Sequence, residues 1–302
     1  MPNTELETIR ARLAASPRPA GLAERRARLD ALGAQYALPP DLRVEPVPAA
    51  GIPLDAPVGA PAEWTATEAA DPSRVILFLH GGGYISGSLA SHRHMIAEAG
   101  RQARARTLAL HYRLAPEHPF PAALEDSLAA YRFLLASGFA PARIALAGES
   151  AGGGLALATL ISLRDAGLAL PAAVWLASPW TDLEMRGATM QTRSAVDPVI
   201  QKPYLQELAA AYLAGTDPRA PLVSPIHADL GGLPPTLIQV GAAETLLDDS
   251  LRLAAVAGAA NVRTTLQIWP EMFHGWHLFF PELGEGRASL AEACAFLRAH
   301  LT

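Results

Sequence analysis

The chain has 302 residues, of which 50% are hydrophobic, and a formal net charge of −5. A chain of this length and apolar content can bury a large core, and an α/β fold of this size often forms one domain with an insertion. The acidic balance and the lack of any basic run argue against a nucleic-acid partner.

The lack of a secretory pattern at the N-terminus and the single cysteine indicate a reducing compartment. The first seven residues, MPNTELE, lack the basic-then-apolar profile of a secretory signal. No stretch reaches the ~18 apolar residues that a membrane span requires. Cys294 is the only cysteine, so no intrachain disulfide can form, and its apolar helical surroundings predict a buried, inert thiol. We therefore expect a cytoplasmic protein with no membrane partner.

Helix and strand patterns alternate through most of the chain. Apolar residues at helical spacing predict helices at 4–15 and 21–33, and a proline-rich stretch from 39 to 61 follows. Short apolar runs then predict buried strands of a mostly parallel sheet, at 75–79, 107–110, 144–147, 174–177, 237–240 and 265–269. The segments between and after them predict helices near 91–104, 120–136, 152–165, 247–259 and 287–300.

This alternation predicts an α/β domain whose central sheet is flanked by helices on both faces. The stretch 181–225 interrupts the rhythm with prolines, polar residues and one helical pattern around 204–212, which indicates an insertion after a strand. We therefore expect an N-terminal helical element at 1–45 and a main domain at 46–302 that carries this insertion.

Ser150 lies at the centre of Gly-Glu-Ser-Ala-Gly (148–152), between a predicted strand and a predicted helix. A sharp turn in that context holds a serine hydroxyl in an exposed, strained position, and its neighbours must be small because the two backbones come close. A glycine-rich turn without chemistry would share these letters. The strand–turn–helix context favours Ser150 as a nucleophile.

Attack by a serine on a carbonyl group requires donors for the oxyanion that develops. His-Gly-Gly-Gly (80–83) follows directly on the strand 75–79, and its glycines leave backbone N–H groups uncovered. A phosphate cradle would use similar glycines, but the accompanying lysine pattern is absent. We expect the donors to be the amides of Gly82, Gly83 and Ala151.

His274 is the predicted general base among nine histidines, because it follows the last predicted strand and precedes a glycine. The order serine, acid, histidine along the chain is typical of this arrangement. His277 and His300 are less well placed. His92 and His94 form a His-x-His pair without a further ligand at metal-binding spacing, so we expect no metal site, and His80 is expected to brace its own loop.

Glu244 is the predicted acid, since it lies in the loop after the strand 237–240 and before the next helix begins. Its carboxylate could therefore reach a neighbouring loop. Asp248 falls near the start of that helix, where a carboxylate is often only a favourable cap, and it stays open as an alternative. Asp182, after the strand 174–177, is a further candidate.

Four motifs together carry a family resemblance. They are HGGG at 80–83, YRLAPE at 112–117 continued by FPAALED at 120–126, GESAGG at 148–153 and FHG at 273–275. With these the chain resembles the hormone-sensitive-lipase-like esterases, the bacterial family IV carboxylesterases of the α/β-hydrolase fold. The resemblance implies a helical cap built from the N-terminal helices and an insertion after the sixth strand. It also implies hydrolysis of short- to medium-chain esters without a cofactor, and relatives commonly pair as homodimers through the sheet edge.

Three positions depart from the usual family pattern. Glu149 stands where aspartate is more frequent, His111 replaces the aspartate before the tyrosine–arginine pair, and Glu244 stands where aspartate is commoner. A subset of relatives carries glutamate at that last position, including esterases similar to a monoterpene lactone hydrolase. None of the three changes removes a required chemical group.

The predicted function is a serine carboxylic ester hydrolase that works through an acyl-enzyme. A lactone hydrolase with the same residues is the first alternative, and a catalytically inert small-molecule binding protein of the same fold is the second. The expected ligand is a small ester or lactone. The aromatic residues nearest the motifs could line its pocket or belong to the core and cap: Tyr84, Trp180, Tyr204 and Phe273.

Overall fold

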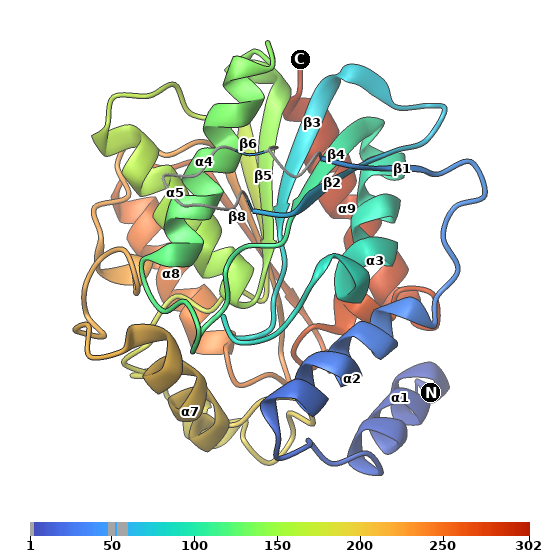
Figure 1. The fold of residues 1–302 in the computed structure, drawn as a ribbon. Coiled ribbons are helices and arrows are strands. Elements are labelled where there is room, and N and C mark those ends of the chain that lie inside the picture. The colour runs from blue at the N-terminus through green and yellow to red at the C-terminus, as the bar shows by residue number, and fades with distance from the viewer. Residues whose placement is uncertain (1–2, 48–51, 53–59) are drawn as a thin grey trace.

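A computed structural model of the chain describes residues 3–47, 52 and 60–302. In this part the chain builds an eight-stranded sheet in the order β1-β2-β4-β3-β5-β6-β7-β8 (Figure 1). From β4 to β8 neighbouring strands are parallel, whereas β1 and β2 run antiparallel at one edge. The strands are β1 Arg43–Pro46, β2 Ala62–Ala66, β3 Asp71–Leu79, β4 Ala105–Leu110, β5 Ile144–Glu149, β6 Ala173–Ala177, β7 Thr236–Gly241 and β8 Thr264–Trp269.

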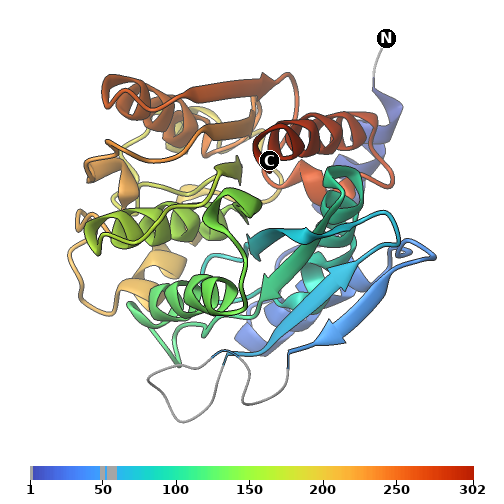
Figure 2. The same cartoon turned by 90° about the horizontal axis from the view of Figure 1, so that it is seen from above.

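Helices cover both faces of the sheet, and Figure 2 shows the two helix layers on opposite sides of it. The helices of the described residues are α1 Thr4–Ala14, α2 Leu22–Ala34, α3 Leu89–Ala103, α4 Ala122–Ala136, α5 Ala151–Asp165, α6 Thr189–Thr192, α7 Lys202–Leu213, α8 Leu247–Ala259 and α9 Gly284–His300. Short 3-10 turns follow the same order: η1 Pro141–Arg143, η2 Pro225–His227 and η3 Trp276–Phe279.

Alternate residues of the central strands enter two separate cores. On β3, Val75 and Leu77 pack with α4, α5 and α8, while Ile76 and Phe78 pack with α3 and α9. Because both faces are covered, a central strand needs apolar side chains at every position. This is why continuous apolar runs correctly predicted β3 to β7 and an α/β architecture. β8 was also expected to be a buried strand, but it lies at the sheet edge and none of its residues is buried.

The sequence patterns missed β1 and β2. All four residues of β1 are exposed, so the strand has no apolar run. On β2, the buried Glu63 interrupts the apolar pattern and is compensated by a bidentate ion pair with Arg93 of α3, at 2.7 and 2.8 Å. β1 is an edge strand and β2 pairs between it and β4, so both are held by backbone pairing and carry little hydrophobic signal.

The N-terminal helices are tied into the molecule. Leu6 and Ile9 of α1 are each 1% exposed and belong to the core under α3 and α9. Strand β1 begins at Arg43 and therefore straddles the predicted boundary at residue 45. Residues 48–51 and 53–59 of the proline-rich stretch lie outside the described residues. Within the described chain, no helix is both long enough and apolar enough to cross a bilayer.

The parallel strands bring distant loops to one edge of the sheet. The loops after β3, β5, β7 and β8 all leave the carboxyl ends of their strands, where sites of α/β proteins form. The segment between β6 and β7 holds α6 and α7, and Figure 1 shows α7, α1 and α2 together at one end of the molecule.

Close contact between α5 and β3 depends on Gly152. A Cβ at this position would lie 2.0 Å from the carbonyl oxygen of Leu79. Gly258, near the end of α8, would meet nothing within 4 Å and offers a matched control. We expect Gly152→Ala to lower the free energy of unfolding by about 1–3 kcal/mol through overpacking. Gly258→Ala should raise it by up to ~1 kcal/mol because alanine favours helix.

Denaturant unfolding of the two glycine variants beside the wild-type protein measures this difference. Equal unfolding midpoints for Gly152→Ala and the wild-type protein would show that the helix start tolerates a side chain.

Candidate active site

Ser150 occupies a strained turn between β5 and α5. Its backbone angles are φ 53° and ψ −119°, a conformation that residues with a side chain rarely adopt. The surroundings hold it there: the Ser150 N–H donates to the carbonyl of Ala177 at 2.9 Å, and its own carbonyl accepts from Trp180 at 2.9 Å. The predicted elbow is therefore present, and it aims the hydroxyl away from the sheet.

The structure brings the three predicted residues into one hydrogen-bonded line. The Ser150 hydroxyl lies 2.9 Å from Nε2 of His274, and Nδ1 of His274 lies 3.2 Å from Oε1 of Glu244. With Nδ1–H donating to the carboxylate, Nε2 is free to accept the serine proton. The geometry matches the spacing that a nucleophile and its base require.

Glu244 is fixed by two further hydrogen bonds. Its Oε2 accepts from the Gly241 N–H at 2.8 Å and from the Ser178 hydroxyl at 2.7 Å. The residue is completely buried. One carboxylate oxygen is thus tied to the protein, and the other faces the imidazole.

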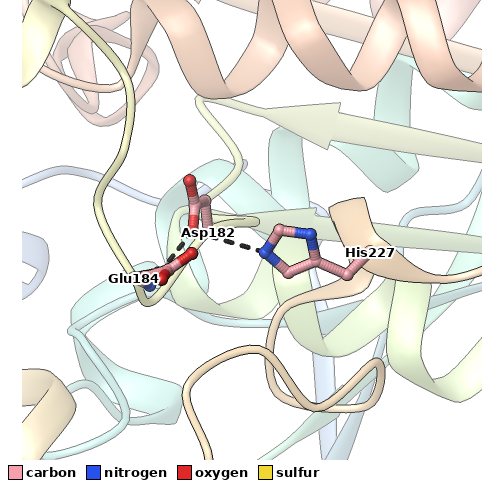
Figure 3. A group of neighbouring side chains, drawn as sticks. All are labelled: Asp182, Glu184 and His227. Atoms are coloured by element: carbon pink, nitrogen blue, oxygen red, sulfur yellow. Dashed lines mark hydrogen bonds and ion pairs between the residues drawn. The ribbon is translucent and has the colours of Figure 1, made fainter.

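The alternative acids have other partners. Asp248 accepts from the Thr189 N–H of the insertion at 3.2 Å. Asp182 binds Arg252 through Oδ2 at 2.6 Å, and its Oδ1 lies 3.8 Å from His227 and accepts from the Glu184 N–H at 3.0 Å (Figure 3).

The group in Figure 3, Asp182, Glu184 and His227, has ligand atoms within 4.8 Å of one another. The Arg252 guanidinium already occupies the central carboxylate of this group, so the chemistry is that of an ion-pair network. The network ties the start of the insertion to α8.

Electrostatics favour a charged imidazole at residue 274. Burial by itself lowers the pKa of His274, but the hydrogen bond and charge of Glu244, together with the charges of Glu149 and Asp197, raise this pKa to about 9. Burial raises the pKa of Glu244, and the hydrogen bond and charge of His274 oppose that rise. The imidazolium that would form when Ser150 loses its proton is therefore stabilised.

Asp197 is a site residue that the sequence patterns missed. Its carboxylate is 3% exposed and accepts from the Thr245 N–H at 2.8 Å, from Val199 at 2.9 Å and from Ile200 at 3.3 Å. The insertion is thereby hydrogen-bonded to Thr245, the residue that follows Glu244. A single aspartate 48 positions before its partner leaves no local pattern that could reveal this contact.

Glu149 and His92 form a second buried pair beside the nucleophile. Oε1 of Glu149 lies 3.8 Å from Nε2 of His274, and its Oε2 lies 3.5 Å from Nε2 of His92. That same His92 nitrogen accepts from the Gly81 N–H at 3.2 Å, and the His92 Nδ1 lies 2.7 Å from the Ser91 hydroxyl. His92 therefore braces the glycine loop, a role that its His-x-His pattern did not indicate.

Three further histidines, His80, His277 and His300, make structural contacts. Nδ1 of His80 lies 2.8 Å from the Gly81 carbonyl, and the ring stacks on Tyr112 at 4.2 Å. Nε2 of His277 lies 3.2 Å from the Gln239 side chain, and burial lowers the pKa of His277 to about 3. Nδ1 of His300 lies 2.9 Å from the Phe296 carbonyl in α9.

Cys294 is buried, and burial raises its pKa to about 12.

The predicted oxyanion donors line the cavity or adjoin it. In the described chain, the N–H groups of Gly82, Gly83 and Ala151 donate to no other protein acceptor. Gly83 has φ +64°, and a Cβ there would lie 2.3 Å from Leu208 of α7. Glycine is favoured at this point because its φ is positive and because a side chain would displace Leu208.

A cavity of about 590 Å³ opens above Ser150. Trp180 and Tyr204 line it, together with residues from α1, α2, the segment joining them and α7. The expectation for Tyr84 and Phe273 needs correction, because neither lines the cavity. Tyr84 is buried and stacks on Tyr212 at 3.7 Å, and Phe273 is buried in the core under α3 and α9.

Comparison with known proteins gives a consistent result. A family model described as alpha/beta hydrolase fold matches residues 76–278. An acetyl-hydrolase of Streptomyces hygroscopicus is 53% identical over 237 residues, which cover 78% of this chain and 79% of the relative. The crystal structure of an esterase from the bacterial hormone-sensitive lipase (HSL) family matches with a TM-score of 0.94 at 42% identity, covering 100% of both chains. The crystal structure of EstE5, which was soaked by p-nitrophenyl butyrate, matches with a TM-score of 0.92 at 41% identity and covers 99% of both chains.

The charge of Asp197 yields a prediction about pH. If the neutral imidazole is the base, kcat/KM should rise with pH up to about 9, the pKa of His274. Asp197→Asn removes a negative charge that raises this pKa. The rising limb should therefore move to lower pH, by roughly 0.5–1 unit.

The pH profile of kcat/KM for p-nitrophenyl acetate measures this shift. Asp217→Asn, an exposed position in the same insertion, makes the same charge change and should leave the profile in place. A profile of Asp197→Asn that coincides with the wild-type profile would contradict the electrostatic role.

Proposed function

The chain belongs to the bacterial hormone-sensitive-lipase family of α/β hydrolases, and we propose that it works as a serine carboxylesterase with Ser150, His274 and Glu244 as its catalytic residues. The observation that supports this assignment most directly is the continuous hydrogen-bonded line from hydroxyl to imidazole to buried carboxylate. Short acyl esters are its substrate class, in keeping with the acetyl-hydrolase and with the relative soaked by p-nitrophenyl butyrate.

The first step forms an acyl-enzyme. Oγ of Ser150 attacks the ester carbonyl carbon while its proton passes to Nε2 of His274, and Glu244 holds the Nδ1–H tautomer and stabilises the imidazolium. The tetrahedral intermediate then collapses. The bond between the carbonyl carbon and the alcohol oxygen breaks, and the imidazolium gives its proton to the departing alcohol.

The second step repeats this chemistry with water. His274 takes a proton from water, the oxygen of that water attacks the acyl carbon, and the bond to Ser150 breaks as the proton returns to Oγ. In both steps the negative oxygen receives hydrogen bonds from the backbone N–H groups of Gly82, Gly83 and Ala151. Loss of one such donor typically costs on the order of 10²–10³ in rate.

The cap is part of the same proposal. We infer that residues 1–45 and the insertion at about 181–225 form it, over a catalytic domain built from the rest of 46–302. Support comes from the cavity, whose wall combines α1, α2 and α7 with the loops around Ser150. A volume of about 590 Å³ suits short- to medium-chain esters.

Lactone hydrolysis is a second candidate, favoured by Glu244 at the acid position. A lactone is a cyclic ester, so the same atoms would open its ring. A homodimer formed through a sheet edge also remains a prediction: β8 is one of the two edge strands, and its Ile268 is 46% exposed.

Replacement of the nucleophile tests the assignment. Ser150→Ala should lower kcat for p-nitrophenyl butyrate by at least about 10⁴-fold, because the triad residues act as one unit. A serine-directed fluorophosphonate should label the wild-type protein at Ser150 and leave the variant unlabelled.

Ser162→Ala provides the control within α5, where the Ser162 hydroxyl has no partner in the described chain and should be dispensable. Substantial esterase activity in Ser150→Ala, or stoichiometric ester binding by the wild-type protein without turnover, would refute the proposal. The second result would indicate the inert binding protein.

A panel of substrates separates esters from lactones. We expect turnover of p-nitrophenyl acetate and butyrate to exceed that of the decanoate ester, in keeping with the acetyl-hydrolase and with the relative soaked by p-nitrophenyl butyrate. ε-Caprolactone and its alkyl derivatives should be opened by the same Ser150-dependent activity if lactones are accepted. Product acids are measured by titration, and an absence of ring opening alongside rapid ester hydrolysis would exclude the lactone candidate.

A further inference from the structure

The wall of the active-site cavity has an unequal balance of charge. Apart from histidines, its charged residues within the described chain are one carboxylate, Glu149 beside the nucleophile, and four arginines of the N-terminal segment: Arg12, Arg18, Arg25 and Arg28. The protein as a whole carries a net charge of −5. The positive wall is therefore a local feature that runs against the overall composition.

Two of these arginines are neutralised by carboxylates that lie outside the cavity wall. Arg12 makes a bidentate pair with Glu282, at 2.8 and 2.9 Å. Arg25 pairs with Glu207 at 2.5 Å. These pairs hold the N-terminal helices against the rest of the molecule, and they contribute little net charge to the cavity.

Arg18 and Arg28 have no carboxylate at ion-pair distance among residues 3–47, 52 and 60–302. Arg28 donates to the carbonyls of Ser16 and Pro17, each at 2.6 Å. Arg18 donates to the carbonyl of Val199 at 2.6 Å, and its guanidinium lies 3.4 Å over the ring of Tyr204. Neutral carbonyls orient a guanidinium, but they do not cancel its charge, and each guanidinium keeps unused N–H donors.

The positive charges are also close enough to influence one another. Burial lowers the pKa of Arg18. The neighbouring charges of Arg25 and Arg28 act in the same direction, whereas Tyr204 and Glu207 act against it. A cavity lined by one sign of charge concentrates oppositely charged ligands because its walls have a low dielectric constant. Helices α1 and α2 and the segment that joins them thus place four arginines on the cavity wall, and this positive part of the wall is called the rim.

The charge of the cavity wall changes from positive to negative near Ser150. Glu149 is 3% exposed and has its Oε1 3.8 Å from Nε2 of His274, so a second anion at this point would be repelled. The nearby wall consists of Gly82, Gly83 and the apolar side chains of Leu205 and Leu208. An uncharged ester carbonyl suits the floor of the cavity, and an anion suits its rim.

We propose that the enzyme selects esters that carry a carboxylate at the end remote from the reacting carbonyl, with Arg18 and Arg28 as the charge partners of that group. Arginine is suited to this role because its planar donors match a carboxylate. The inference rests on the proposed esterase function and specifies the substrate class of the same site.

A matched pair of acetate esters tests the proposal. 4-Acetoxybenzoate carries a carboxylate, and its methyl ester has the same reacting group without the charge. The measured quantity is the ratio of kcat/KM for the anion to kcat/KM for the methyl ester. Arg18→Gln/Arg28→Gln should lower this ratio by about tenfold, and Arg18→Lys/Arg28→Lys should retain most of it because the charge stays.

The controls separate charge at the rim from net charge and from folding. Arg132→Gln/Arg263→Gln removes two exposed arginines outside the cavity wall and should leave the ratio unchanged. Added salt should lower the wild-type ratio, since it screens the rim. The salt dependence is measured on the wild-type protein. It therefore tests the proposal even if Arg18→Gln/Arg28→Gln fails to fold.

Two failures are distinguishable. A ratio that neither salt nor Arg18→Gln/Arg28→Gln changes would overturn the inference while the esterase assignment stands. Hydrolysis of the methyl ester that survives Ser150→Ala would overturn the esterase assignment itself.

Discussion

The site depends on a carboxylate that is kept charged without water. Glu244 is completely buried, and burial favours its neutral form. Hydrogen bonds from Gly241 and Ser178 and the facing imidazole of His274 offset that cost. Because Oε2 is occupied, only Oε1 can reach the histidine, and this sets the tautomer and the direction of the ring. The serine then meets the one nitrogen that can take its proton.

Backbone at the ends of parallel strands supplies the second constraint. Ser150 holds positive φ only because Ala177 and Trp180 bind its backbone and because α5 begins within contact of β3. The loop at 80–83 is braced by His92 through the Gly81 N–H. Contacts from β6 and β3 thus support the strain at Ser150, and α3 supports the neighbouring glycine loop, which is how rigid elements position reactive groups.

The insertion and the N-terminal helices do more than cover the site. Asp197 of the insertion binds the residue after Glu244 and adds negative charge near His274. Leu208 of α7 packs on Gly83 so closely that a side chain there would displace it. Arg18 and Arg28 bring positive charge to the cavity rim. Under the proposed function, the cap would thereby affect the basicity of His274, the geometry of the oxyanion donors and the charge of the preferred substrate together.

The sequence by itself determined the central strands, the helices between them and the three residues that meet at the site. Such features are local: a buried parallel strand needs a continuous apolar run, and the elbow needs small residues on both sides of Ser150. Only the tertiary structure decided the pairing of β1 and β2, the burial of Tyr84 and Phe273, and the positions of Asp197, Glu149 and the rim arginines. These depend on contacts between residues far apart in the chain, whose physical effect appears only when folding removes the water between them.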